Sequence, residues 1–293
     1  MKVIRVCMGG HMNAKNSGDD ILYHFFQKQL MANNPDFAKS FIVQAINALG
    51  IWIHPDLYQK LPVILPFVVR DPSCRKNKIT GKDEWASPND EGFLRDDNSL
   101  VKGIIKSMPV TPNNSLYVGK TLGNGFVASH IWRRIKPGNN IDFASRNPWL
   151  NTFVPNLVWL PKQISKMTDR EGDFAQQYVQ ALSRHIYQHC SFRFPLQERI
   201  QRLWSLLPKA DGFKDEELPS LSDLNFFEPR GKIVTARINK IEQVIDAIKK
   251  ILANEPLEKK IIASRYTVGL PHVDHKKLSL LANNLQTYLD ELK

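Results

Sequence analysis

The chain has 293 residues, of which 42% are hydrophobic and 24% charged, which is typical of a globular protein and excludes a disordered one. Forty Lys and Arg residues against 29 Asp and Glu residues give a net charge of +11, which favours a polyanionic partner such as a nucleic acid. No apolar run approaches the roughly 18 residues that a membrane-spanning helix needs. The three cysteines are too few and too far apart for a disulfide framework, and no signal-peptide pattern opens the chain, so we expect a reduced, cytoplasmic protein.

The first 110 residues are predicted to be mainly helical. Apolar residues recur at helical spacing over 19–30 and again over 36–50, where Gly50 is suited to end the helix. A short helix is expected at 56–61. The apolar run 62–70, which lies between prolines, is compatible with a strand or with a buried loop.

Residues 74–98 differ from this pattern, because basic, aromatic and turn-forming residues are interleaved without a period. Long irregular segments inside compact domains often carry function. A solvated connector explains the same composition. The side chains here that are suited to contact phosphates or stack on bases are Lys76, Lys78, Lys82, Trp85 and Arg95.

The next elements are short. Residues 99–108 predict an amphipathic helix that Pro109 ends. Two strands are expected at 116–120 and 125–128, joined by a hairpin-type connection.

Two helices are predicted further on, at 173–189 and 196–207. His185 and His189 stand four residues apart on the first of them, which is compatible with a metal site, but no third ligand is evident and a solvated face is favoured. The acidic, proline-bearing stretch 210–229 is typical of a loop or linker.

The last sixty residues predict two helices with strong apolar stripes, at 238–252 and 276–292, which suit a core or a dimer interface. The segment between them is basic and would suit a phosphate-contacting edge. Its basic residues are Lys259, Lys260, Arg265, His272, His275, Lys276 and Lys277.

The residues that suit chemistry lie between Val127 and Lys166. The block Ala128-Ser129-His130-Ile131 ends a short apolar run at a histidine, and Pro155-Asn156-Leu157-Val158-Trp159-Leu160-Pro161 opens a second run with an asparagine. In this order the two blocks resemble the HNH (ββα-metal) nuclease superfamily, and more narrowly HNH-type restriction endonucleases. The resemblance implies a two-stranded ribbon followed by a helix, with one divalent ion, Mg²⁺ or Mn²⁺, held between them.

Hydrolysis of a phosphodiester needs a base for the attacking water and positive charge on the phosphate. A neutral imidazole at a strand end can take the proton, provided that a neighbour fixes its tautomer. We therefore assign His130 as general base and Asn156 as the residue that orients it.

The metal ligands implied by the resemblance depart from the family's pattern. The family usually places Asp before the base histidine and His or Asn on the helix, whereas this chain has Ser129 and Ser165 there. Serine is a weak ligand for a hard cation, so Asp142 or Asp169 is expected to supply a carboxylate. Lys162 or Lys166 would be an electrostatic substitute. An insertion over 133–151, or a degenerate motif, would explain the long spacing from His130 to Asn156.

The sequence predicts an α+β protein, a mainly helical body with an embedded ββα-metal (HNH-like) motif. We expect a helical DNA-recognition region at 1–110, an HNH-like catalytic region at 111–190, and a helical region for DNA contact or dimerisation at 191–293. The expected activity is that of a metal-dependent type II restriction endonuclease, which cuts double-stranded DNA as a homodimer. The residues expected to bind nucleic acid are Lys76, Lys78, Lys82, Trp85, Arg95, Arg133, Arg134, Lys162 and Lys166.

Three alternatives remain. A non-catalytic nucleic-acid-binding protein would use the basic loop 74–98 and the basic C-terminal region without cleavage. A different nuclease core would start from Pro35-Asp36 or Pro55-Asp56, although no Glu-x-Lys pair follows either of them at strand-like spacing. A small-molecule enzyme has no cofactor signature in its favour.

Overall fold

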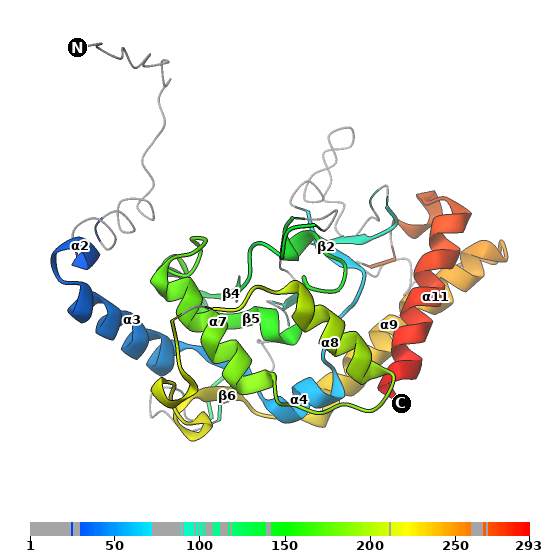
Figure 1. The fold of residues 1–293 in the computed structure, drawn as a ribbon. Helices are drawn as coiled ribbons and strands as arrows, with labels where there is room; N and C mark the ends of the chain where they lie inside the picture. Colours follow the sequence, from blue (N-terminus) through cyan, green and yellow to red (C-terminus); the bar gives the residue numbers. More distant parts are fainter. Residues whose placement is uncertain are drawn as a thin grey trace, which may run out of the picture.

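A four-stranded sheet lies among the helices of the protein in this computed structural model (Figure 1). The structure describes residues 30–71, 91–96, 108–111, 119–138, 142–210, 212–258 and 269–293, with a few single positions outside these ranges. In spatial order the strands are β4 (Phe126–His130), β5 (Leu157–Pro161), β1 (Ile51–Ile53) and β6 (Asn225–Phe227). β5 is antiparallel to both of its neighbours, and β6 is parallel to β1. A separate parallel pair is formed by β2 (Val68–Arg70) and β3 (Leu94–Asp96).

Helices make up most of the rest of the described chain. The α-helices are α2 (Met31–Asn33), α3 (Pro35–Leu49), α4 (Pro55–Lys60), α6 (Lys162–Ser165), α7 (Phe174–Tyr187), α8 (Leu196–Leu206), α9 (Gly231–Leu252) and α11 (His275–Leu292). Short 3-10 helices are η3 (Ala144–Arg146), η4 (Val154–Asn156), η5 (Asp215–Glu217), η6 (Leu221–Asp223) and η7 (Leu270–His272). None of these helices is long and apolar enough to cross a membrane.

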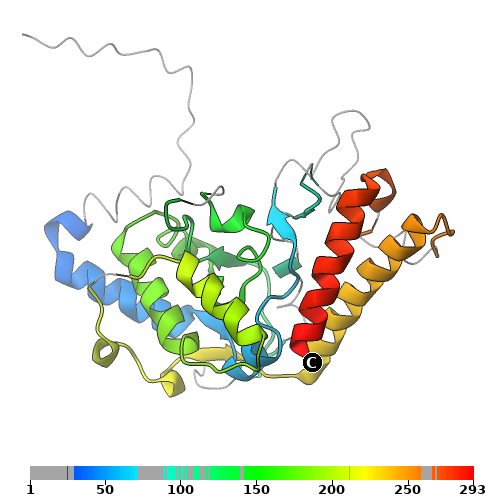
Figure 2. The same cartoon turned by 45° about the vertical axis from the view of Figure 1, so that its right-hand side comes forward.

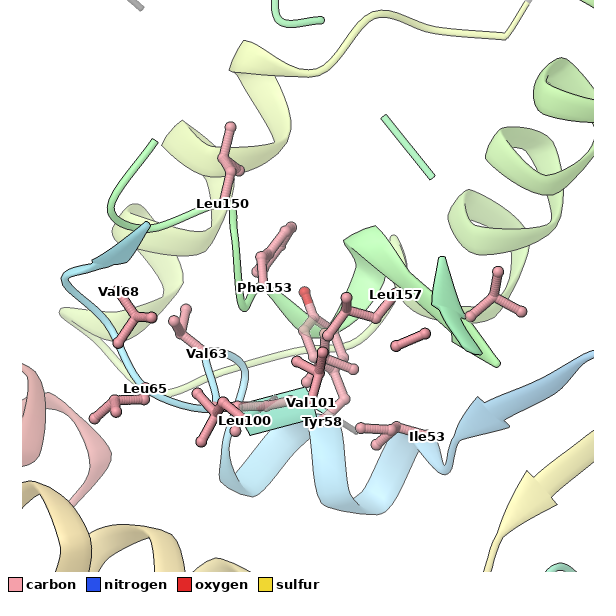
Figure 3. Packing of buried hydrophobic residues seen from close by; sticks show 14 of the residues in the cluster. Ile53, Tyr58, Val63, Leu65, Val68, Leu100, Val101, Leu150, Phe153 and Leu157 are labelled. Carbon is pink, nitrogen blue, oxygen red and sulfur yellow. The ribbon is translucent and has the colours of Figure 1, made fainter. Parts of the chain in front are cut away.

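Buried aromatic side chains hold the sheet to the helices. Trp159 of β5 and Phe227 of β6 have no exposed surface, and their rings meet edge to face with centroids 5.1 Å apart. Figure 3 shows another part of the same core, where Tyr58 of α4 lies near Phe153 and Leu157; the rings of Tyr58 and Phe153 are 6.1 Å apart. Edge-to-face aromatic pairs of this kind stabilise a core beyond their buried area. The start of β5 is therefore rigidly supported.

The long helices α9 and α11 lie side by side, at the end of the molecule opposite α3 (Figures 1 and 2). The hydroxyl of Tyr288 in α11 donates to the Val63 carbonyl at 2.7 Å and accepts from the Val63 amide at 3.0 Å. Glu291, also in α11, forms an ion pair with Arg199 of α8. The guanidinium of Arg199 lies 4.1 Å from the ring centroid of Trp149. These contacts fasten the helix pair to the body.

The α+β class is confirmed, and so are the strongly periodic helices. Those expected at 36–50, 56–61, 173–189, 196–207, 238–252 and 276–292 appear as α3, α4, α7, α8, α9 and α11. The helices expected at 19–30 and 99–108 fall mostly outside the described residues.

Two predictions that bear on the sheet are corrected. The strand expected at 125–128 exists as β4, but it pairs with β5 and not with 116–120, of which the described positions form a turn. The stretch 210–229, expected to be a loop or linker, contains β6, which completes the sheet next to β1. Both errors concern pairing between residues distant in sequence, which local patterns do not encode.

The sheet takes strands from all three predicted regions. β1 lies in 1–110, β4 and β5 lie in 111–190, and β6 lies in 191–293. The described part of the first region contains β1, β2 and β3 beside α2, α3 and α4. The roles assigned to the three regions stay predictions.

Candidate active site

His130 ends β4 and faces the start of β5. The two strands pair along their whole length, from Phe126 opposite Pro161 to His130 opposite Leu157. α6 follows β5 without a gap and packs on both strands. Two antiparallel strands and a helix therefore form one contiguous unit with the histidine at its edge.

A cavity of about 370 Å³ lies beside this unit. His130 lines it together with four cationic side chains, which come from β2, from the segment after β4, and from α6 and its C-terminal end. Asp169 is the one carboxylate among the described lining residues. The cationic residues are Arg70, Arg133, Lys162 and Lys166. A cavity with this excess of positive charge suits a phosphate group.

The tautomer of His130 is fixed by a backbone carbonyl. Its ring atom Nε2 lies 2.9 Å from the carbonyl oxygen of Asn151. Because a carbonyl only accepts hydrogen bonds, Nε2 carries the proton in this contact and Nδ1 of the neutral ring keeps its lone pair. The half-buried imidazole is thus arranged to accept a proton at Nδ1.

The neutral ring is also favoured by its surroundings. Burial lowers the pKa of His130 to about 4, an effect that the nearby charge of Arg70 reinforces. The Asn151 carbonyl and side chain act in the opposite direction and are outweighed. His130 is therefore an unprotonated base at neutral pH.

Asn156 has a different contact from the one expected. Its side chain is fully buried; Oδ1 accepts from the Trp132 amide at 2.8 Å, and Nδ2 donates to the Leu150 carbonyl at 2.9 Å. It joins the segment after His130 to the turn before Asn151. The residue that contacts the His130 ring is Asn151. Asn156 supports that contact indirectly, through its bonds to the Trp132 amide and the Leu150 carbonyl.

The turn that carries Asn151 is held on several sides. The Oδ1 atom of Asn147 accepts from the Trp149 and Leu150 amides at 3.0 and 3.1 Å. The hydroxyl of Thr152 donates to the Leu65 carbonyl at 2.8 Å and accepts from the Leu65 amide at 3.2 Å. The Asn151 carbonyl is therefore a fixed acceptor.

The residues predicted to bind metal do not come together as a ligand set. The hydroxyl of Ser165 donates to the Lys162 carbonyl at 3.0 Å. Asp142 is exposed and does not line the cavity, whereas Ser129 and Asp169 do. Over the described ranges no group of three or more His, Cys, Asp or Glu side chains could hold a metal ion. Because Mg²⁺ takes oxygen ligands in octahedral geometry, usually with one or two carboxylates, these residues do not fit it.

The predicted nucleic-acid contacts divide into three groups. Arg133, Lys162 and Lys166 line the cavity, while Arg134 is exposed and does not. Arg95 lies on β3 and forms an ion pair with Asp71 at 3.8 Å. Outside the described residues lie Lys76, Lys78, Lys82 and Trp85.

Two residues of the candidate site were missed from the sequence. Arg70 ends β2 and reaches the cavity from a segment distant in the chain. Asn151 belongs to a cluster of turn-forming residues at 147–151, and this cluster is the sequence pattern that could have indicated it.

The low pKa of His130 predicts a pH-dependent stability. The ring has a pKa near 6.5 in the unfolded chain, and its folded pKa is lowered to about 4. The neutral ring therefore contributes stability that is present above pH 6.5 and lost as the pH falls toward 4, to a limit of about 3 kcal/mol. Urea unfolding at pH 7 and pH 4.5 should show a larger loss for the wild type than for His130→Gln. Equal losses would contradict the lowered pKa.

Searches against protein-family models, curated proteins and solved structures find no match to this chain. The features of the molecule that bear on its function are His130, the basic cavity and the unit formed by β4, β5 and α6.

Proposed function

We propose that the chain is an endonuclease of the HNH (ββα) type that hydrolyses phosphodiester bonds in double-stranded DNA. One observation carries the proposal. His130, held as a neutral base by the Asn151 carbonyl, lines a cavity with four cationic side chains and one carboxylate among its described residues. Phosphodiester hydrolysis needs this combination of base and positive charge.

The order of elements supports the same class. The family resemblance implies two antiparallel strands followed by a helix, and β4, β5 and α6 have this order. The His at the end of the first strand and the Asn just before the second hold the positions that the resemblance implies. The assignment to the HNH type therefore rests on the two sequence blocks that contain His130 and Asn156, together with the order of β4, β5 and α6.

Each residue has a defined part in the reaction. A water molecule attacks the phosphorus atom and gives one proton to Nδ1 of His130. The bond from phosphorus to the leaving oxygen breaks, and that oxygen takes one proton, so that one water is consumed and a phosphomonoester and a hydroxyl end are formed. The cavity's cationic side chains bind the phosphate oxygens, where negative charge builds up in the transition state. Asn156 and Asn151 keep the imidazole in place.

The substrate that we favour is double-stranded DNA, cut in the manner of a type II restriction endonuclease. The net charge of +11 suits a polyanion, and a homodimer would match the two-fold symmetry of a palindromic site. The dimer and the cytoplasmic location belong to this proposal.

A non-catalytic DNA-binding protein is the second candidate. The observation in its favour is that the described residues offer no metal ligand set, as a degenerate nuclease motif would also lack one. Such a protein would use the same basic cavity to bind DNA without cutting it.

A cleavage assay separates the two candidates. Purified protein is incubated with linear duplex DNA carrying a broad sequence library, with Mg²⁺ or Mn²⁺, and the ends are sequenced. We expect discrete breaks at a recurring sequence. Binding in a mobility-shift assay with no breaks in either buffer would contradict the nuclease and favour the second candidate.

A further inference from the structure

We infer that the cationic side chains of the cavity, led by Lys162 and Arg133, take the place of a divalent metal ion on the scissile phosphate, so that hydrolysis by this site is metal-independent. The inference rests on the proposed endonuclease function. It goes beyond that function on one point, which is that no divalent ion shares the scissile phosphate with these side chains.

The chemistry of the donor set argues against a magnesium centre. Asp169 is the single carboxylate among the described lining residues, and its Oδ2 atom lies 3.7 Å from Nζ of Lys166. The hydroxyl of Ser165 is engaged with the Lys162 carbonyl. A dication here would meet four like charges and one carboxylate that already has a cationic partner, so both ligation and charge disfavour it.

The same cavity is well arranged to bind a phosphate oxygen directly. Lys162, the first residue of α6, is exposed and has no ion-pair partner in the part of the chain that the structure describes. The guanidinium of Arg133 donates to the backbone carbonyl of Asp169, which orients the group and leaves its charge in place. Oriented Arg and Lys donors form strong, charge-assisted hydrogen bonds to phosphate.

The base does not require a metal-bound hydroxide. Nε2 of His130 donates to the Asn151 carbonyl, so Nδ1 is the ring nitrogen that keeps a lone pair and takes the proton of the attacking water. The leaving oxygen takes a proton from the ammonium group of a cavity lysine, and the proton on His130 is afterwards released to solvent, from which the lysine is reprotonated. The base and the acid of the step therefore both come from the chain, and one water is consumed.

The test compares cleavage of duplex DNA in EDTA and in Mg²⁺, with the wild type, the double variant Arg133→Gln/Lys162→Gln, and Lys60→Gln. Lys60 is an exposed lysine of α4 that does not line the cavity, so Lys60→Gln is the matched control. We expect wild-type cleavage in EDTA within about 3-fold of the rate in Mg²⁺, and a loss of about 10²-fold or more in the double variant. The control should cut at the wild-type rate.

DNA binding by the same variants is measured in addition to cleavage. Fluorescence anisotropy of a labelled duplex in EDTA should report wild-type binding and at least about 10-fold weaker binding by the double variant. The melting temperature of the protein should not rise when millimolar Mg²⁺ is added, since a ligand that binds the folded state stabilises it.

The outcomes are distinct. Cleavage that stops in EDTA and returns with Mg²⁺ overturns this inference and leaves the proposed function standing. No cleavage in either buffer overturns the proposed function and the inference together. Cleavage in EDTA that the double variant retains in full overturns the role given to Arg133 and Lys162.

Discussion

Replacement of His130 with alanine is expected to lower the rate of DNA cleavage by about 10²–10⁴-fold, the usual contribution of a positioned general base. DNA binding should change little, because the cationic side chains of the cavity remain. Single-turnover cleavage and a mobility-shift assay with the same duplex measure the two effects. Normal cutting by His130→Ala would remove the basis of the whole assignment.

The matched control for this variant is His185→Ala. His185 is also half-buried, and its Nε2 atom also contacts a backbone carbonyl, that of Pro219 at 3.1 Å. It lies on α7 and does not line the cavity. The loss of a similar hydrogen bond without the loss of a base should leave the cleavage rate within about 3-fold of wild type.

The pH–rate profile gives a second view of the same base. Because burial lowers the pKa of His130 to about 4, the acid side of the profile should fall near pH 4 and not near 6.5. An acid limb near 6.5 would mean that the ring is solvated when the enzyme works.

Asn156→Ala is expected to destabilise the fold by about 2–4 kcal/mol, since two hydrogen bonds are lost and buried backbone groups keep no partner. The Trp132 amide loses its acceptor and the Leu150 carbonyl loses its donor. Asn156→Asp should also be unfavourable, because a carboxylate cannot donate to the Leu150 carbonyl. Urea unfolding at pH 7 measures both variants.

The control for Asn156→Ala is the same substitution at an exposed asparagine. Asn283 lies on α11 with its side chain in solvent, so Asn283→Ala should shift the unfolding free energy by no more than about 0.5 kcal/mol. If Asn156→Ala were as mild as Asn283→Ala, the buried Asn156 side chain would not be what holds the two segments together.

The sequence carried the local features of the fold. The helical stripes of α7, α9 and α11 depend on spacing within one segment, so their positions could be predicted. β6 could not, because its three residues form a strand only through pairing with β1, about 170 residues away.

The candidate site, too, could be predicted from the sequence only in part. His130 could be found because a histidine at the end of an apolar run is a local pattern. The partner of its ring could not, since the Asn151 carbonyl is a backbone group that any residue type would supply, and only the fold of the turn brings it to Nε2. Arg70 lines the cavity from β2, a strand distant in sequence from β4, β5 and α6. Only the tertiary fold brings it to the site.

The contacts of α11 have a consequence for synthesis. Tyr288 bonds to Val63, a partner 225 positions away in the sequence, and the segment that contains Val63 pairs in turn with Phe153, beside the turn of Asn151. Such distant contacts form late, because the loop they close is long. The ribosome makes α11 after every other described element, so His130 acquires its full support only after α11 has emerged. In the proposed nuclease, the contacts that hold the His130 ring would therefore be complete only once α11 has packed on the body.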